Sequence, residues 1–93
     1  MIVTIKDQKF EVIKNEKEGF DASAVEERLT DYFDGYDYIV GDWAYDKLRL
    51  KGFNNKGNKL YNKFNDYNNV DKYIKENCAY GCKHFILKRN KVE

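Results

Sequence analysis

Short apolar stretches at both ends of the chain predict β-strands. Residues 2–5 and 10–13 alternate side chains on either side of the polar stretch 6–9, which predicts a β-hairpin. Residues 84–89 contain the continuous apolar run Phe85–Leu87. An uninterrupted run of this kind is typical of a strand that is covered on both faces.

The middle of the chain predicts a second antiparallel pair of strands. Residues 36–43 are β-branched and aromatic, and residues 48–53 alternate leucines with Arg49 and Lys51. The alternation places the leucines on one face and the two cations on the other. A further strand is expected over 59–64, after a turn rich in Asn and Gly.

A first helix is expected between these two strand regions. Ser23 and Glu26 have the spacing of a capping box, and Asp21 is a competing N-cap. A helix of about ten to twelve residues would follow and end at Gly35. Its apolar stripe is formed by Val25, Leu29, Tyr32 and Phe33.

A second helix is expected after Asn68 or Asn69, where either side chain could cap it. Val70, Tyr73 and Ile74 recur at helical spacing. Gly81 is placed to end this helix. Together the patterns predict an α+β fold, a mainly antiparallel sheet with two helices in the order ββαβββαβ, and residues 1–93 are expected to form a single domain.

Composition narrows the class of protein. Hydrophobic residues make up 42% of the chain and aromatic residues 16%, which is too rich in bulky side chains for a disordered chain. No apolar run is long enough to span a membrane, and no signal-type stretch follows Met1. Two cysteines do not form a disulfide framework. We therefore expect a cytoplasmic protein with reduced thiols and no membrane partner.

The net charge of +1 conceals a strong asymmetry. Residues 1–46 carry five Lys/Arg and twelve Asp/Glu, a net charge of −7. Residues 47–93 carry twelve Lys/Arg and four Asp/Glu, a net charge of +8. This separation produces a functional field only if the fold keeps the two signs on different faces.

The basic half interleaves cations with aromatic rings. Binders of single-stranded RNA combine these two features, because cations contact phosphates and rings stack on bases. The sequence therefore favours a non-enzymatic binding module for an anionic partner, either RNA or a ribonucleoprotein. A solvated strand face is the alternative interpretation. The candidate binding residues are Asp42, Trp43, Tyr45, Arg49, Lys51 and Phe53.

The charge asymmetry also fits a protein–protein adaptor or a homodimer. In the homodimer, the acidic half of one chain would meet the basic half of another. This alternative needs no nucleic acid. It differs from the RNA hypothesis in the partner that the basic half would contact.

Three soft metal ligands lie close together near the C-terminus. Cys78, Cys82 and His84 fall within seven residues, but the sequence has no other Cys or His to complete a structural zinc site. A metal or thiol site is therefore a weak alternative, and burial of two small apolar side chains is the simpler interpretation. No cofactor is predicted.

Nothing in the sequence predicts an enzyme. The nucleophile, phosphate-loop and zinc-protease motifs are absent, and the only serine, Ser23, is explained as a helix cap. A hard cation could in principle use Asp34, Asp37, Asp42 and Asp46. Aspartates near turns more often bond their own backbone, however, so these carboxylates carry little specificity.

Several segments resemble the YutD-like family. They are the stretches 10–15, 19–20, 36–43 and 48–53 and the pattern around Cys78 and Cys82, in the family's order. The resemblance implies a small intracellular protein of Firmicutes-type bacteria. It implies no substrate, cofactor or catalytic residue.

Overall fold

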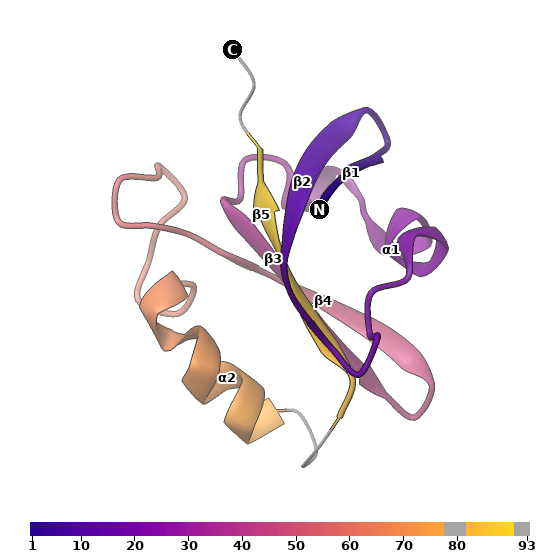
Figure 1. Cartoon of the computed structure of the whole chain (residues 1–93). Helices are drawn as coiled ribbons and strands as arrows, with labels where there is room; N and C mark the ends of the chain where they lie inside the picture. The colour runs from indigo at the N-terminus through magenta and orange to yellow at the C-terminus, as the bar shows by residue number, and fades with distance from the viewer. Residues whose placement is uncertain (78–81, 91–93) are drawn as a thin grey trace.

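A five-stranded antiparallel sheet forms the centre of the molecule (Figure 1). The computed structural model describes residues 1–77 and 82–90. The strands lie in the order β1-β2-β5-β3-β4, so β1 and β4 form the two edges. They are β1 (Ile2–Ile5), β2 (Gln8–Glu16), β3 (Tyr38–Ala44), β4 (Lys47–Phe53) and β5 (His84–Arg89).

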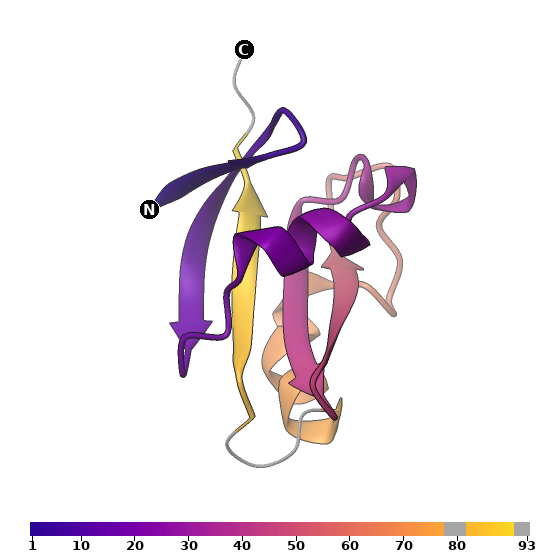
Figure 2. The same cartoon turned by 90° about the vertical axis from the view of Figure 1, so that its right-hand side faces the viewer.

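Two short helices cover opposite faces of this sheet (Figure 2). Helix α1 (Ala22–Arg28) lies on one face and α2 (Val70–Asn77) on the other. Single 3-10 turns, η1 (Asp31–Phe33) and η2 (Tyr67–Asn69), lie in the connections. The α+β class, the antiparallel sheet and the two helices are thus confirmed.

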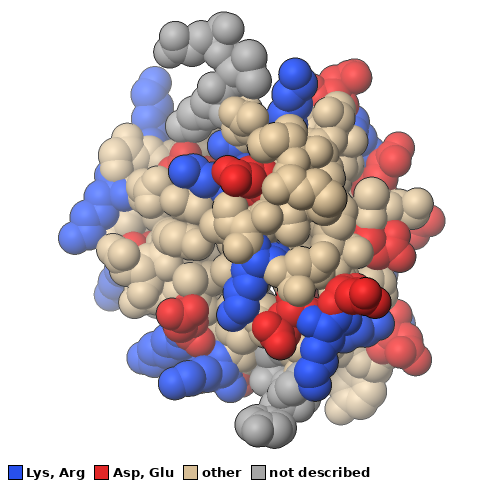
Figure 3. Space-filling view, viewed as in Figure 1, with Lys and Arg blue, Asp and Glu red and all other residues tan. Residues whose placement is uncertain are grey.

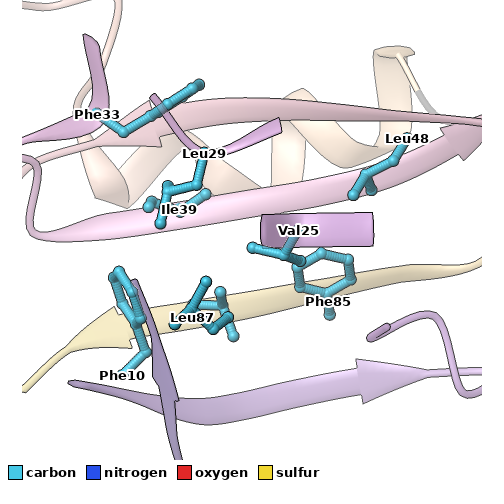
Figure 4. Packing of buried hydrophobic residues seen from close by; sticks show 9 residues of the cluster. Phe10, Val25, Leu29, Phe33, Ile39, Leu48, Phe85 and Leu87 are labelled. Atoms are coloured by element: carbon cyan, nitrogen blue, oxygen red, sulfur yellow. The ribbon is translucent and has the colours of Figure 1, made fainter. Parts of the chain in front are cut away.

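Each face of the sheet has its own hydrophobic core. Phe85 and Leu87 of β5 are fully buried in the core on the α1 side, and Ile86 packs into the core on the α2 side. This confirms that β5 is covered on both faces, as its apolar run predicts. Figure 4 shows the α1-side core, where side chains from the strands meet those of the α1 segment.

The first helix is shorter than its apolar spacing predicts. Asp21, not Ser23, is the N-cap, and its side chain accepts a hydrogen bond from the N–H of Ala24 at 3.2 Å. The helix ends because Leu29 adopts an extended conformation, with φ −77° and ψ 116°. The carbonyl of Leu29 accepts a hydrogen bond from the Lys6 ammonium at 2.7 Å. A tertiary contact therefore competes with continuation of the helix.

The strand expected over 59–64 does not form. This stretch consists of turns, because asparagine side chains bond nearby backbone N–H groups. Asn58 accepts from Leu60 at 2.8 Å, and Asn62 accepts from Phe64 at 2.8 Å. Local side-chain bonds replace the ladder that a strand would need.

The second helix begins close to the expected position. Asp66 caps the preceding turn η2, whereas the sequence favoured Asn68 or Asn69 as caps. The side chain of Asp66 accepts from the Asn68 N–H at 2.9 Å. Gly81, expected to end the helix, lies outside the described residues. In the described part of the chain, no helix is long and apolar enough to cross a membrane.

Candidate functional site

The β3–β4 hairpin positions every candidate binding residue. Its loop contains only Tyr45 and Asp46, both left-handed with φ 52° and 62°, and Ala44 pairs directly with Lys47. This is the geometry of a type I′ turn, which matches the twist of the two strands. The side chain of Tyr45 is 98% exposed at the tip.

Asp42 and Arg49 form an ion pair across the hairpin. They are directly opposite in the register, and the Arg49 Nη2–Asp42 Oδ2 distance is 2.5 Å. Asp42 is only 2% exposed, and its hydrogen bond raises the pKa of Arg49 above the ordinary value. Arg49 also donates to the carbonyl of Asn77 at 2.6 Å. The candidate binding residue Arg49 is therefore not a free cation.

The ring of Phe53 is not available for stacking. Phe53 is completely buried and packs edge-to-face against Tyr73, with the ring centroids 5.4 Å apart. The candidate binding residue Phe53 therefore has no exposed ring with which to contact a partner. Alternation along β4 turns Phe53 toward the α2-side core, together with Val70 and Ile86.

Trp43 has a structural hydrogen bond. Its indole N–H donates to the carbonyl of Gly19 at 2.7 Å, and the half-buried ring packs against the α1-side core. The ammonium of Lys83 lies 5.2 Å from the ring centroid. Trp43 therefore joins the β2–α1 connection to the hairpin.

A groove of about 520 Å³ follows the outer edge of β4. Its floor is the backbone around Leu50 and Gly52, at the free side of the sheet. Four rings, two cations and two asparagines complete the lining: Tyr32, Tyr36, Phe64, Tyr73, Arg49, Lys51, Asn62 and Asn65. The structure thus brings together Arg49 and Lys51 of the predicted site, and leaves Tyr45 at the tip.

Glycine at position 52 is required by one wall of the groove. A Cβ atom there would lie 2.4 Å from Cδ1 of Tyr36, so the tyrosine ring lies directly over the strand. Tyr36 is in turn 5.8 Å from Tyr32, ring centroid to ring centroid. A hydrogen bond between their side chains, aided by burial, raises the pKa of Tyr36.

The opposite wall carries the positive charge. The ammonium of Lys51 lies 5.3 Å from the Phe53 ring centroid and 5.8 Å from that of Tyr73. Burial raises the pKa of the Tyr73 phenol. Among the described lining residues there is no carboxylate, and none forms an ion pair with Lys51. The groove therefore presents cations and rings together.

The charge asymmetry of the sequence is partly kept on the surface. In the view of Figure 3, acidic side chains gather on the right, on the side of α1, and basic side chains dominate the left. Both signs mix along the lower rim. A charge field thus survives, although the pair of buried Asp42 and partly exposed Arg49 joins the two halves.

The cysteine and histidine cluster does not have the form of a zinc site. Cys82 is disulfide-bonded, contrary to the expectation of reduced thiols, and a disulfide sulfur is not the thiolate that zinc requires. Cys78, the only other cysteine, lies outside the described residues. His84 is buried, and its Nδ1 lies 3.1 Å from the carbonyl oxygen of Cys82.

The four aspartates considered for a hard cation do not gather. Asp42 is paired with Arg49, and Asp37 accepts from the N–H of Asn55 at 2.9 Å. Asp34 and Asp46 are exposed, Asp46 at the hairpin tip. No group of three or more metal-ligating side chains occurs among residues 1–77 and 82–90.

None of the four rings that line the groove was predicted as a site residue. Tyr32 and Tyr73 were assigned to helix stripes, and Tyr36 to a strand, so their common location depended on tertiary structure. The usable signal was Gly52, because a glycine inside an alternating strand often marks a close approach. Phe64, which falls in the strand expected over 59–64, is 76% exposed and lines the groove.

Comparison with known proteins identifies the family. The model of a family described as "YutD-like: Putative antitoxin YutD-like" matches residues 4–88. The chain belongs to the YutD-like family. It is 42% identical over 88 residues to "Putative antitoxin YutD" of Bacillus subtilis (strain 168), covering 95% of this chain and 97% of that protein.

A solved member of the YutD-like family has the same fold. The chain matches the solution NMR structure of protein yutD from B. subtilis with a TM-score of 0.80 and 41% identity. The match covers 100% of this chain and 86% of that one. The resemblance to the YutD-like family seen in the sequence is therefore confirmed.

Proposed function

We propose that this chain is an antitoxin, a non-enzymatic protein that binds a toxin protein in the cytoplasm and holds it inactive. The descriptions of the family and of the B. subtilis relative supply the functional class. The groove along β4 supplies the surface. It is the observation that carries the proposal, because it combines exposed rings and cations at an unpaired sheet edge.

The composition of the groove is that of a protein interface. Aromatic residues and arginine are enriched at the centres of such interfaces, where they contribute most of the binding energy. Tyr32 is 69% exposed and Phe64 76% exposed, although both are large apolar side chains. A partner that covers them would bury this surface at no cost to the fold of the free chain.

A protein partner is favoured over RNA or a ribonucleoprotein. The RNA hypothesis requires a track of free cations beside exposed rings. Arg49 is instead held by Asp42, and Phe53 is buried. Of the predicted strand residues, Lys51 is the cation in the groove without an ion pair in the described part of the chain.

The proposal is tested by capture and neutralisation. The tagged chain is used to capture proteins from its native host, with nuclease treatment as a control for RNA-mediated retention. Each captured protein is then expressed alone and together with the chain. If the chain is an antitoxin, one captured protein should arrest growth when it is expressed alone and should not arrest growth when it is expressed together with the chain.

Variants connect this result to the groove. The double substitution Tyr32→Ala and Phe64→Ala removes two exposed rings from the groove, whereas Tyr45→Ala removes an even more exposed ring at the hairpin tip. We expect the groove variant to lose growth rescue and Tyr45→Ala to keep it. Retention that disappears with nuclease, or rescue that depends on Tyr45 alone, would contradict the proposal.

A further inference from the structure

We propose that the partner binds by adding a strand to β4, as an extended segment in which acidic residues alternate with apolar ones. This inference rests on the proposed function for the statement that the partner is a protein. It adds the conformation and the chemistry of the bound segment. The backbone of β4 forms the floor of the groove.

The hairpin register determines which backbone groups of β4 are free. In a two-residue hairpin, the pair next to the loop exchanges both hydrogen bonds, and bonded pairs then alternate. Ala44 pairs with Lys47, so Arg49 and Lys51 also bond β3 through their backbones. The N–H and C=O groups of Leu50 and Gly52 must point away from the sheet.

The end of β4 supports this assignment. Asn54 lies an even number of residues from Leu50 and Gly52, so its backbone N–H and C=O also point away from β3. Both groups are already bonded to another segment of the chain. Its N–H donates to the carbonyl of Asn65 at 2.7 Å, and its carbonyl accepts from the N–H of Tyr67 at 3.0 Å. The chain thus adds one short parallel bridge to its own β4 edge and leaves the next positions open.

No described residue bonds the outward backbone groups of Leu50 and Gly52. Both residues line the groove; Leu50 is half-buried, and Gly52 is buried beneath the Tyr36 ring. An unpaired row of backbone groups is the template used in β-strand addition, where main-chain bonds give affinity and alternate side chains give specificity. The groove therefore accepts an extended segment.

The two walls specify the side chains of that segment. On the α2 side, Lys51 and, toward the hairpin tip, Lys47 have no ion pair in the described part of the chain. Both would lie next to residues on one face of the added strand, at the short distances at which opposite charges stabilise sheet pairs. On the α1 side, the other residues would meet Leu50, Tyr36 and Tyr32. Acidic residues on one face and apolar residues on the other satisfy both walls.

The same cations oppose pairing with a second copy. Two β4 edges placed side by side would bring Lys47 and Lys51 of one chain close to the same residues of the other. Like charges in adjacent strands are destabilising. The edge is therefore protected against self-association and open to an acidic strand of a different protein.

The test uses a synthetic peptide of about eight residues, long enough to run along β4. The peptide alternates Glu with Val and carries a fluorophore, and binding to the full chain is followed by anisotropy. Two control peptides replace Glu with Lys or carry N-methyl groups on alternate residues. We expect binding of the acidic peptide that weakens with salt, and a loss of about tenfold or more for each control.

A matched pair of variants tests the backbone itself. Leu50→Pro removes one outward N–H without removing a bond to β3, and Leu50→Ala removes the same side chain but keeps the N–H. We expect Leu50→Pro to lose the peptide and Leu50→Ala to keep it within about threefold. If circular dichroism shows that Leu50→Pro does not fold, binding of the N-methylated peptide to the wild-type chain tests the backbone bonds instead.

Each outcome separates this inference from the proposed function. Equal binding of the acidic and N-methylated peptides, equal binding of the Glu and Lys peptides, or no binding of any peptide would overturn strand addition. Growth rescue by the chain would still support an antitoxin in all three cases. Conversely, selective binding of the acidic peptide without any neutralised toxin would retain the edge site and reject the proposed function.

Discussion

Two glycines in neighbouring strands lie beneath aromatic rings, one in the centre of the sheet and one at its edge. Gly41 of β3 lies under Phe85, which is completely buried, and an added Cβ would be 2.1 Å from Cζ of that ring. Gly52 of β4 lies under Tyr36, which is half-exposed. The close approach of ring to backbone is the same, but the surroundings are not.

The difference shows that the same contact, an aromatic ring packed over a glycine, can stabilise a core or form the wall of a groove. In the centre, the ring is fully buried in the α1-side core, so the contact contributes only to stability. At the edge, the ring stands beside unpaired backbone and forms a wall of a groove. Substitutions should therefore separate the two regions, with the centre responding in stability and the edge responding in binding.

The largest effect is expected for Gly41→Ala in the centre. The new Cβ cannot be accommodated without moving Phe85, which is packed on all sides, so the free energy of unfolding should fall by about 3 kcal/mol. Urea denaturation of both proteins measures this change. A loss below about 1 kcal/mol would show that the ring moves easily and that the centre is not packed as described.

Arg49 joins the two regions, and its loss should have the next largest effect. Arg49→Leu leaves the buried Asp42 carboxylate without its cation and should cost about 2 kcal/mol, because partial exposure of Arg49 admits water. Adding Asp42→Asn should recover part of this loss. A double variant less stable than Arg49→Leu would contradict the coupling of the pair.

Gly52→Ala should affect the edge more than the fold. Tyr36 is half-exposed and can swing outward, so we expect a loss of only about 1 kcal/mol in the free energy of unfolding. The displaced ring would narrow the groove and weaken binding of the acidic probe peptide. Denaturation and anisotropy on the same sample compare the two effects. Unchanged peptide binding would place the site elsewhere.

The hairpin tip should gain stability when its loop residue is changed. Tyr45 has φ 52°, a conformation that asparagine adopts more easily, so Tyr45→Asn should raise the free energy of unfolding by about 0.5 kcal/mol. Tyr45→Ala remains in the same conformation without asparagine's preference and is the matched control. Peptide binding should not change in either variant, since the tip lies outside the groove.

The smallest effect concerns acid stability of the loop that closes the end of β4. The N–H of Asn68, followed by the hydroxyl of Tyr61, holds the pKa of Asp66 below its ordinary value. A lowered pKa in the folded state means that the stabilisation is complete above pH of about 4 and is lost as the pH falls through the folded value. Asp66→Asn should therefore show a smaller loss of stability between neutral and acidic pH, measured by thermal unfolding. An equal loss would show that other carboxylates dominate.

Much of the sheet could be predicted from the sequence because its apolar pattern is local. The alternation in β4 and the continuous run in β5 gave their positions and faces correctly. The prediction of a strand over 59–64 was wrong because asparagine side chains bond the nearby backbone there, which outweighs the strand preference of the aromatic residues.

The site was harder to predict because it depends on register. The loop at Tyr45 and Asp46 contains neither Gly nor Asn, the residues that normally signal a two-residue hairpin. Recognition of this loop would have placed Asp42 opposite Arg49 and shown that the pair neutralises itself. The tyrosines of the groove come from three separate segments, which no sequence spacing relates.

The most direct test of the edge site is the amide spectrum of the isotopically labelled chain during titration with the acidic probe peptide. Strand addition predicts that the amides of Leu50 and Gly52 shift most and exchange more slowly with solvent, because their N–H groups gain acceptors. Shifts confined to the Tyr45 tip or to β1, with unchanged exchange at Leu50 and Gly52, would contradict it.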